Sequence, residues 1–429
     1  MSSLAMLCHR AGLRVAGSDR AKNHLTEKLV SAGIPVYEGH DASHPDGFDA
    51  VVYTGAVSSD NPELVSAAER GVPIIYRAAL LGDFMKSYPC RIGVAGMHGK
   101  STTTGMIAHL LASAGKDPTV VSGAVMPEFD GAYAVGGQET FVFEACEYKN
   151  SFLDFFPTIA VILNLDLDHT DFFPDMEAIR TSFARYAAIA GESGGVSLVN
   201  GDDENALLAT QNENRILFGF SEGCRFRAAE EREENGRWTF TACDGERKIG
   251  TFSLRVPGKH QIYNALAAIA CGELLGLTES ELKRGIETFS GVARRLEHRG
   301  AFGGADLYLD YAHHPRELEA TLKTARAMAS GRVLCAFEPH TYSRTAALYP
   351  DFCRVLSEAD MTVLLDVYAA RETDTMGIVP QTMARDIRGG VYAPSYETAA
   401  ELLKSEARPG DVLLILGAGT IDTMMQYFE

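Results

Sequence analysis

The sequence predicts an α/β protein of three domains built mainly on parallel sheets. Short apolar runs alternate with helical patterns along almost the whole chain, which is typical of strands connected by helices. A glycine-rich turn at 96–103 separates one such strand from one such helix. The chain of 429 residues is long enough for about three domains of ~150 residues each.

The first predicted domain covers residues 1–88 and ends at Ser-Tyr-Pro, which indicates a linker. Runs of β-prone residues predict its strands, and helical patterns predict the helices between them. The predicted strands are 14–18, a short segment around Val36, 50–53 and 73–76, and the predicted helices are 24–32 and 62–70.

The second predicted domain covers residues 89–295. Asp175 precedes a predicted helix at 176–190 and is a candidate N-cap. Residues 214–256 are charged and β-prone, with turns at Glu234-Asn-Gly and Cys243-Asp-Gly, and they predict a small antiparallel excursion. The other predicted strands are 91–95, 141–144 and 159–163, and the other predicted helices are 101–114 and 261–275.

The third predicted domain covers residues 296–429. Its apolar runs are separated by helical patterns, which predicts a compact doubly wound domain. The predicted strands are 306–310, 333–337, 362–367 and 412–416.

Composition excludes several classes of function. A net charge of −18 argues against general nucleic-acid binding and against anionic membrane surfaces. No apolar run reaches the ~18 residues that a membrane-spanning helix needs, and we expect no membrane insertion. The eight scattered cysteines form no C-x-x-C pair, which favours reduced thiols in a cytoplasmic protein.

The turn at 96–103 predicts a phosphate-binding loop. Backbone N–H groups and a helix N-terminus meet there, so phosphate oxygens can bind. Lys100 would reach the β- and γ-phosphates of ATP, and the Ser101 hydroxyl would face Mg²⁺. Val94 stands where the strict motif has its first glycine, so the pattern is a shorter one that begins at Gly96. The alternative is a purely structural glycine turn.

Acidic residues follow the next two predicted strands. Glu144 ends the strand 141–144, and the segment Asn164-Leu-Asp-Leu-Asp-His-Thr-Asp171 follows the strand 159–163. Mg²⁺ prefers hard oxygen ligands, so Glu144 fits well. His169 is a less usual ligand, which from chemistry alone suggests a contact through water or with a second metal ion. The alternative is a solvated acidic turn before the next helix.

The chain resembles the Mur ligase family over essentially its whole length. The segments that carry the resemblance occur in the family's order, and as a set they are strongly specific. They are 96–103, 144–153, 164–171, 257–268, 289–297, 310–315, 338–345, 368–372 and 417–419.

The resemblance implies a Rossmann-like N-terminal domain, a P-loop ATPase-like central domain and a Rossmann-like C-terminal domain. It implies an ATP- and Mg²⁺-dependent amide ligase that joins L-alanine to the lactyl carboxylate of UDP-N-acetylmuramate through an acyl phosphate. This reaction belongs to peptidoglycan precursor synthesis, and so to cell-wall biogenesis, cell shape and cell division. We expect a cytoplasmic monomer or homodimer.

The resemblance also implies roles for individual residues. The residues expected at the ATP phosphates are Gly96, Met97, His98, Gly99, Lys100, Ser101 and Thr102. His260 and Asn264 are expected at the adenine, and Arg295 and Asp310 are expected to reach ATP from the domain junction. Ser101 and Glu144 are expected to bind one Mg²⁺ and His169 a second. Tyr311, His313 and Arg344 are expected at the substrates, and Lys100, Glu144, His169 and His313 are expected to be catalytic.

Taken singly, some of these residues have structural alternatives: a helix-capping Asn264, a surface ion pair for Arg295, and a packed loop His313. The chain also departs from the family pattern at four places. They are Met97 in place of Thr, Cys146-Glu-Tyr-Lys in place of Asp-Glu-Ser-Asp, Gln261 in place of Asn, and Thr341 where an Arg often stands.

Family members open with a strand and a Gly-x-Gly-Gly-x-Gly-Met-Ser-Gly turn that holds the uridine diphosphate. This chain opens on what aligns with the following helix, so we expect the first strand and its turn to be lacking and nucleotide-sugar binding to be weakened. Ser18-Asp19, Gly39-His40-Asp41 and Tyr53-Thr54-Gly55-Ala56 are the remaining candidates on the uridine side.

Three alternative functions stay open. A ligase that attaches a preformed murein peptide to the same sugar nucleotide would share nearly all these motifs. A kinase would use the phosphate loop, but it leaves the segments 257–260 and 310–315 without a role. A non-catalytic nucleotide-binding protein would gain support if the N-terminal turn is lacking.

Overall fold

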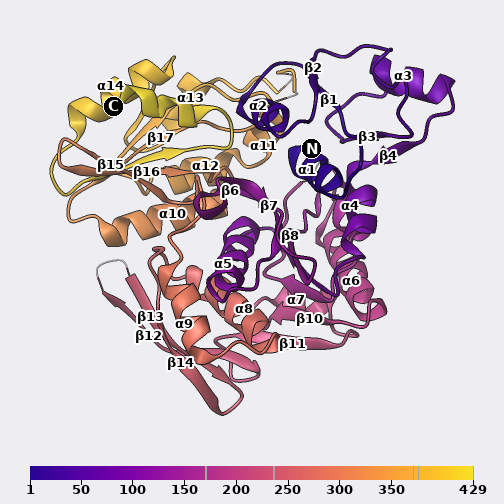
Figure 1. The fold of residues 1–429 in the computed structure, drawn as a ribbon. Helices are drawn as coiled ribbons and strands as arrows, with labels where there is room; N and C mark the ends of the chain where they lie inside the picture. Colours follow the sequence, from indigo (N-terminus) through magenta and orange to yellow (C-terminus); the bar gives the residue numbers. More distant parts are fainter. Residues whose placement is uncertain (170–171, 235–236, 371, 375, 429) are drawn as a thin grey trace. The chain divides into compact units, whose positions relative to one another are not determined.

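The computed structural model describes residues 1–169, 172–234, 237–370, 372–374 and 376–428. The chain forms two compact units, which are described separately. The first unit comprises residues 1–227, 243–247 and 266–285, and the second comprises residues 228–242, 248–265 and 286–429. Figure 1 gives the course of the chain and the labels of its elements.

The N-terminal block of the first unit contains two separate parallel sheets, each of two strands. In one sheet β1 (Gly17–Asp19) pairs with β2 (Val36–Glu38), and in the other β3 (Val51–Tyr53) pairs with β4 (Ile74–Tyr76). Helices accompany them as α1 (Ser2–Arg10), α2 (His24–Ser31), α3 (Pro62–Glu69) and α4 (Arg77–Met85). The predicted strands and helices are confirmed, with ends shifted by one to three residues. The expected lack of a preceding strand and glycine turn stays a prediction.

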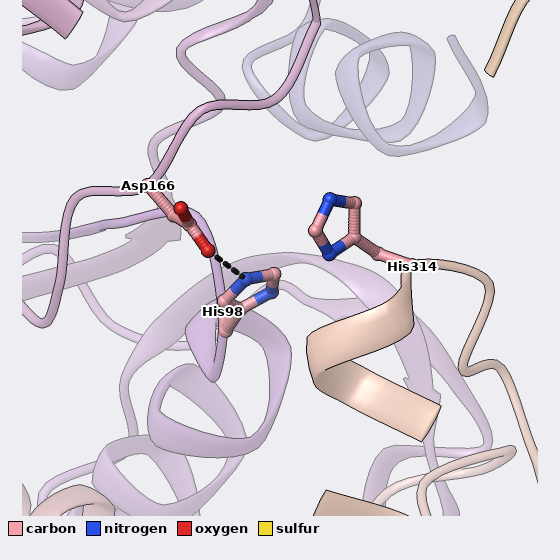
Figure 2. A group of neighbouring side chains, drawn as sticks. All are labelled: His98, Asp166 and His314. Carbon is pink, nitrogen blue, oxygen red and sulfur yellow. Dashed lines mark ion pairs between the residues drawn. The ribbon is translucent and has the colours of Figure 1, made fainter. Parts of the chain in front are cut away.

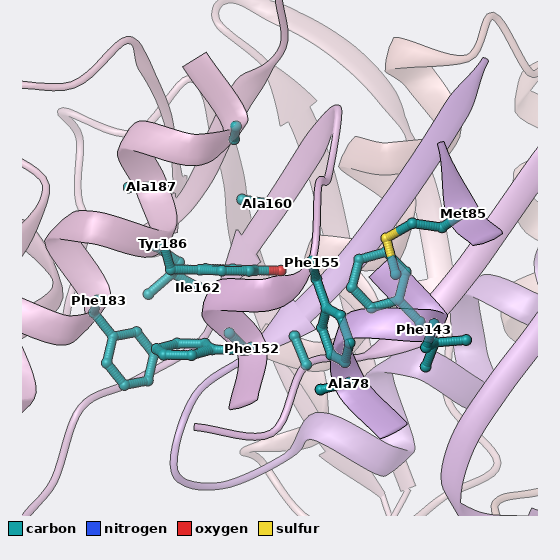
Figure 3. Close-up of a cluster of buried hydrophobic side chains, with 14 of the residues drawn as sticks. Ala78, Met85, Phe143, Phe152, Phe155, Ala160, Ile162, Phe183, Tyr186 and Ala187 are labelled. Atoms are coloured by element: carbon teal, nitrogen blue, oxygen red, sulfur yellow. The ribbon is translucent and has the colours of Figure 1, made fainter. Parts of the chain in front are cut away.

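Helix α4 was not predicted, and its packing explains why it forms. Ala78, Leu81 and Met85 are buried in the same apolar cluster as Phe152 and Phe155 (Figure 3). A Cβ atom at Gly82 would lie only 1.9 Å from the carbonyl oxygen of Asp154, so the helix approaches this segment at a point that only glycine allows. The helix is therefore fixed by tertiary contacts that no local pattern reveals.

Within a ten-stranded sheet, the strands of the central region have the order β11-β10-β9-β5-β8-β6-β7, and these neighbours are all parallel except β6 and β7. Strand β5 thus lies between β8 and β9, as a phosphate loop in a doubly wound sheet requires. The strands are β5 (Cys90–Ala95), β6 (Thr119–Met126), β7 (Gly131–Ala134), β8 (Thr140–Glu144), β9 (Ile159–Ile162), β10 (Val196–Asn200) and β11 (Arg215–Gly219).

The helices of the central region are α5 (Lys100–Ser113), α6 (Met176–Glu192), α7 (Glu204–Ala209), α8 (Gln261–Leu274) and α9 (Glu279–Thr288), and a 3-10 segment η2 spans Tyr148–Asp154. The Asp175 side chain accepts a hydrogen bond from the Ala178 amide at 2.9 Å, so the predicted N-cap of α6 is confirmed.

The antiparallel excursion begins later than predicted. Strand β11 runs parallel to β10, so residues 215–219 belong to the parallel sheet. The excursion consists of β12 (Phe226–Glu234), β13 (Arg237–Asp244) and β14 (Arg247–Ser253), whose short connections make them hairpins. Gly245 has a φ of 58° in the second turn, as the predicted Asp-Gly turn requires. Residues 235–236 of the first turn lie outside the described residues.

The C-terminal part of the second unit is a six-stranded sheet in the order β15-β16-β20-β17-β18-β19. Only the edge strand β15 (Glu297–Phe302) is antiparallel to its neighbour. The other strands are β16 (Ala305–Asp310), β17 (Val333–Phe337), β18 (Met361–Leu364), β19 (Gly390–Tyr392) and β20 (Val412–Leu416). The helices are α10 (Pro315–Met328), α11 (Tyr342–Ala347), α12 (Tyr349–Leu356), α13 (Pro380–Asp386) and α14 (Tyr396–Glu406).

Two apolar clusters bury alternate residues of this sheet. Leu414 and Cys335 belong to one cluster, while Leu413 and Leu334 belong to the other. Since successive strand residues point to opposite faces, both faces of the sheet are covered. The predicted doubly wound architecture is therefore confirmed.

The predictions about membrane insertion and about the cysteines can be compared with the structure. Among the described residues, no helix combines the length and the apolar character needed to cross a bilayer. All eight cysteines are free thiols, as predicted. Burial raises the pKa of the Cys335 thiol to about 12, so it stays protonated at neutral pH.

Candidate active site

The predicted phosphate loop connects β5 to α5, and its glycines are required by the backbone. Gly96 has a φ of 141° and Gly99 a φ of 86°, both in the region that favours glycine. A Cβ atom at Gly96 would also lie 3.0 Å from the Cβ of Leu163. The Asn164 side chain holds the loop by accepting from the His98 amide at 2.8 Å and donating to the His98 carbonyl at 2.9 Å.

Met97 stands where the family has Thr, and its side chain belongs to the apolar core. The residue is 6% exposed and lies in the cluster that contains Ala95 and Leu165. Its amide donates to the Asn164 carbonyl at 3.1 Å. Met97 therefore anchors the loop to the sheet, and the absence of a hydroxyl there has a packing reason.

Lys100 is the first residue of α5, and its ammonium group is held by the protein itself. Its Nζ donates to the carbonyls of Gly96 at 2.5 Å and Met97 at 3.2 Å. The same Nζ lies 3.0 Å from Oε2 of Glu147, whose side chain is 1% exposed. Lys100 and Glu147 therefore form a buried ion pair directly beneath the loop.

Glu147 also links Lys100 to His169, because Nε2 of His169 lies 3.3 Å from Oε1 of Glu147. Burial alone would raise the pKa of Glu147, but the Lys100 charge and the His169 hydrogen bond outweigh burial and hold this pKa below its ordinary value. The prediction missed Glu147. Glu147 lies in the segment 144–153 that carries the resemblance, and it is the one residue of Cys146-Glu-Tyr-Lys that matches the family's Asp-Glu-Ser-Asp, which could have marked it as a site residue.

The predicted Mg²⁺ ligand Glu144 ends β8, directly opposite Val94 of β5. Its Oε2 accepts a hydrogen bond from the Gly123 amide at 2.7 Å, which orients the carboxylate. Ser101 lies in the first turn of α5 and is 4% exposed, and Thr102 is 5% exposed. A carboxylate and a hydroxyl are hard oxygen donors of the kind that Mg²⁺ binds, so the chemistry of this donor pair fits that ion.

His98 and Asp166 form a second polar pair at the loop, with 3.6 Å between Nε2 of His98 and Oδ2 of Asp166 (Figure 2). Asp168 accepts a hydrogen bond from the His169 amide at 2.7 Å, and His169 has a φ of 53°. The two residues that complete the predicted segment, Thr170 and Asp171, lie outside the described residues. The side chains that follow β9 therefore point back to the phosphate loop, as their sequence position predicted.

On the N-terminal sheets, two of the predicted uridine-side segments meet. The Ser18 hydroxyl lies 3.1 Å from Nδ1 of His40 and donates to Oε2 of Glu63 at 2.8 Å. Oε1 of Glu63 also lies 2.6 Å from Nδ1 of His44. Glu63 of α3 was not predicted, and it connects Ser18 at β1 with the loop that follows β2.

In the second unit, the predicted adenine residues form a hydrogen-bonded chain at the start of α8. Nε2 of Gln261 lies 3.0 Å from Nε2 of His260, and the Asn264 amide donates to Oε1 of Gln261 at 2.9 Å. Burial lowers the pKa of His260 to about 4, so the imidazole is neutral at pH 7. Gln261, a departure from the family pattern, thus orients both predicted residues.

Asp310 ends β16 and is 7% exposed. It accepts hydrogen bonds from the amides of Leu296 at 2.8 Å and Ala312 at 2.7 Å. Burial raises its pKa to about 6, although Arg295 and these hydrogen bonds act in the opposite direction. The Arg295 guanidinium lies 3.9 Å from Glu317 and 5.2 Å from the centre of the Tyr311 ring.

His313 and Arg344 come together around a histidine that the prediction had not singled out. Arg344 NH1 lies 3.3 Å from Nδ1 of His340, and the rings of His313 and His340 are 5.7 Å apart. Burial, with the charges of His313 and Arg344, lowers the pKa of His340 to about 4. His340 is therefore a neutral acceptor for Arg344, while Nδ1 of His313 lies 3.0 Å from the Tyr311 carbonyl.

Three family profiles match the chain in consecutive segments. Residues 1–89 match the profile described as "Mur ligase family, catalytic domain". Residues 94–272 match "Mur ligase middle domain", and residues 294–419 match "Mur ligase, glutamate ligase domain".

Curated relatives align over the whole chain. A protein of Acetivibrio thermocellus named UDP-N-acetylmuramate–L-alanine ligase is 40% identical over 100% of this chain and 93% of its own length. A protein of Clostridium novyi with the same name is 41% identical over 100% of this chain and 94% of its own length.

Solved structures share the architecture. The crystal structure of a UDP-N-acetylmuramate-alanine ligase from Thermotoga maritima superposes with a TM-score of 0.83 at 26% identity, covering 100% of this chain and 95% of that chain. A murein peptide ligase from Psychrobacter arcticus superposes with a TM-score of 0.75 at 22% identity, with the same coverage, which shows the common fold.

Proposed function

Because this chain belongs to the Mur ligase family, we propose that it is an ATP-dependent ligase that joins L-alanine to UDP-N-acetylmuramate. The observation that carries the proposal is the phosphate loop with its buried Lys100–Glu147 pair, beside Glu144 at the end of β8. Relatives that carry this name are 40–41% identical over the full chain, which supports the choice of substrates.

The reaction has two steps. First, an oxygen of the lactyl carboxylate attacks the γ-phosphorus of ATP, the bond to the bridging oxygen breaks, and an acyl phosphate and ADP form. Then the amine of L-alanine attacks the acyl carbon, phosphate leaves, and the amine loses a proton. Phosphoryl transfer depends on positioning and charge neutralisation, which the loop amides and Lys100 supply at the phosphates.

The divalent ion would be held by Ser101 and Glu144, with His169 at a second ion. When bound, Mg²⁺ neutralises phosphate charge during the transfer. Glu147 keeps Lys100 charged and holds it beneath the loop, since the pKa of Lys100 is raised by this carboxylate against the opposing effect of burial. Gly123 orients Glu144 through its amide.

The second unit supplies the remaining contacts in this proposal. Neutral His260 and the Asn264 amide would hydrogen-bond the adenine, and Arg295 with Asp310 would reach the nucleotide when the domains close. Tyr311 and Arg344 would bind the substrates. His313, which faces Glu317 at 3.3 Å, is the proposed acceptor of the amine proton.

An ADP-release assay with UDP-N-acetylmuramate, Mg²⁺ and single amino acids tests the proposal. We expect release that depends on L-alanine and not on a murein tripeptide. The reverse preference would make the chain a peptide-attaching ligase. Absence of amino-acid-dependent release would overturn the assignment. The proposed setting is peptidoglycan precursor synthesis in the cytoplasm, by a monomer or homodimer.

A further inference from the structure

Arg77 lies where the carboxyl ends of two parallel strands meet. It is the first residue of α4 and directly follows β4, and Tyr53 of β3 is in register with Tyr76 of β4. The rings of these two tyrosines are 5.5 Å apart. The segment that begins at Tyr53 was predicted on the uridine side. In open parallel sheets, ligands bind beyond the carboxyl ends of the strands, so Arg77 is on the ligand side of this block.

The Arg77 guanidinium has no partner within the described part of the chain. Its Nε is buried and without a hydrogen bond, and the side chain makes no ion pair with any described residue. Arg91, a nearby arginine on β5, differs in this respect because its guanidinium donates to the carbonyls of Tyr88 and Phe156. Arg77 also stands at a helix N-terminus with no acidic residue in the first turn.

The groups that act electrostatically on Arg77 include the Cys146 thiol, the Tyr76 phenol and the N-terminal ammonium group of Met1. The Tyr76 phenol is neutral at pH 7, and burial raises its pKa further. Burial lowers the pKa of the guanidinium itself, but a guanidinium stays charged at neutral pH. Arg77 is thus a partly buried positive charge that no anionic side chain pairs with among the described residues.

The position of Cys146 shows which reaction this charge would serve. Cys146 stands between Glu144, the proposed Mg²⁺ ligand, and Glu147, the partner of Lys100, and the charges of all three act on the thiol. Helix α4, which begins at Arg77, contacts η2, which directly follows Glu147, and Ala78 and Ala145 belong to one apolar cluster. Arg77 therefore lies where the N-terminal block meets the phosphate-loop site. An anionic group of a substrate bound to the N-terminal block would, if it contacts Arg77, lie close to the site of phosphoryl transfer.

We propose that Arg77 binds an oxyanion of the acceptor sugar nucleotide and positions that substrate for attack on ATP. A partly buried guanidinium without a counter-charge costs free energy, and a bound carboxylate or phosphate removes that cost through charge-assisted hydrogen bonds. The inference rests on the proposed function. The acceptor offers two oxyanions, the lactyl carboxylate and the diphosphate, and they share this chemistry.

Two nucleotide probes separate these sources. UDP-N-acetylmuramate carries both oxyanions, whereas UDP-N-acetylglucosamine carries only the diphosphate. Each is titrated calorimetrically into the full chain and into its Arg77→Gln and Arg77→Lys variants. Arg91→Gln is the matched control, since it removes an arginine whose partners are backbone carbonyls. The midpoint of thermal unfolding without ligand is measured for every variant.

We expect Arg77→Gln to weaken binding of UDP-N-acetylmuramate about 10- to 100-fold, the usual effect of losing a hydrogen bond to a charged group. Arg77→Lys should recover part of the loss. A parallel loss for UDP-N-acetylglucosamine assigns Arg77 to the diphosphate, and an unchanged affinity for it assigns Arg77 to the carboxylate. The unliganded Tm of Arg77→Gln should equal or exceed that of the parent, whereas Arg91→Gln should lower Tm without changing affinity.

Two results would overturn the proposal: affinity for both nucleotides unchanged within twofold in Arg77→Gln, or a fall in its unliganded Tm comparable to that of Arg91→Gln, which marks a structural role. If the parent chain binds neither nucleotide, this proposal is overturned for the chain, while the proposed ligase function is decided separately by the ADP-release assay.

Discussion

Glu147 and Asp310 are both buried carboxylates near the carboxyl ends of parallel strands, yet their pKa values shift in opposite directions. Glu147, beside the phosphate loop, has a lowered pKa because Lys100 lies 3.0 Å away. Asp310, in the C-terminal sheet, has a pKa raised to about 6 because burial outweighs the more distant Arg295. The partner in contact therefore decides the charge of a buried acid, and burial alone does not.

The largest expected effect comes from removing the cation of the Lys100–Glu147 pair. Lys100→Ala should reduce alanine-dependent ADP release about a thousandfold or more, because both the phosphate contact and the charge it supplies in transfer are lost. Steady-state ADP release measures this loss. Lys323→Ala, which removes an exposed lysine paired with Glu319, is the control. Near-normal turnover in Lys100→Ala would leave the loop as a structural glycine turn.

Removing the anion should cost stability. Glu147→Gln leaves Lys100 buried without its counter-charge, and breaking a buried pair from one side costs about 3–5 kcal/mol. Denaturant unfolding at pH 7 measures the change. Glu192→Gln, which breaks the exposed pair with Arg185, should cost no more than about 1 kcal/mol. Equal effects in the two variants would show that the Glu147 pair contributes as little as a surface pair.

The two carboxylates should give stability opposite dependences on pH. The pKa of Asp310 is raised from 3.8 to about 6 in the folded state, so the folded state binds this proton at a higher pH than the unfolded state does. The contribution of Asp310 to the free energy of unfolding therefore rises by up to about 3 kcal/mol as the pH falls through this range. The contribution of Glu147 is present above its ordinary pKa of 4.5 and is lost only as the pH falls below that value.

Unfolding curves between pH 4 and 7 for the parent and Asp310→Asn test this difference. His260 and His340, whose pKa values are lowered to about 4, reduce the stability as the pH falls over the same range. The Asp310 contribution is therefore the difference in unfolding free energy between the parent and Asp310→Asn, which should rise from pH 6 to pH 4. A difference that stays constant over this range would show that Asp310 does not titrate there.

The smallest expected effect comes from Arg295→Gln. The Arg295 charge lowers the pKa of Asp310 against burial, so removing this charge should move the Asp310 titration to a higher pH. The midpoint of the stability rise reports the shift. Arg299→Gln, which lies on β15 and pairs with Glu297, should leave the midpoint unchanged. A midpoint that does not move in Arg295→Gln would mean that solvent screens Arg295 from Asp310.

Elements with strong local patterns were predictable from the sequence. The strands 333–337 and 412–416 match β17 and β20 in both ends, and the phosphate loop lies between a strand and a helix as its glycines indicated. Local pattern failed where the partner lies far away in the chain. Strand β11 joins the parallel sheet through β10, although it lies within the charged and β-prone stretch 214–256.

Prediction of the site residues had the same limit, because contacts between residues distant in the sequence could not be foreseen. The residues that carry the family's motifs could be named, whereas the side chains that orient them could not. Glu147, Gln261 and His340 each connect two predicted residues, and each connection is a contact between side chains that sequence spacing does not specify. All three occupy or adjoin positions where the chain departs from the family pattern. A departure next to a predicted site residue is therefore a useful indication of an orienting contact.

The close approach of α4 at Gly82 has a consequence for dissecting the protein into fragments. A fragment that starts at residue 89, after the predicted linker, would uncover the apolar surface that Ala78, Leu81 and Met85 protect. Expression of an isolated ATP-binding region should therefore begin ahead of Arg77. Since Leu4, Leu7 and Cys8 of α1 lie in the same cluster, a fragment that starts at Arg77 would still expose part of this core, and the proline after α4 does not separate independently packed units.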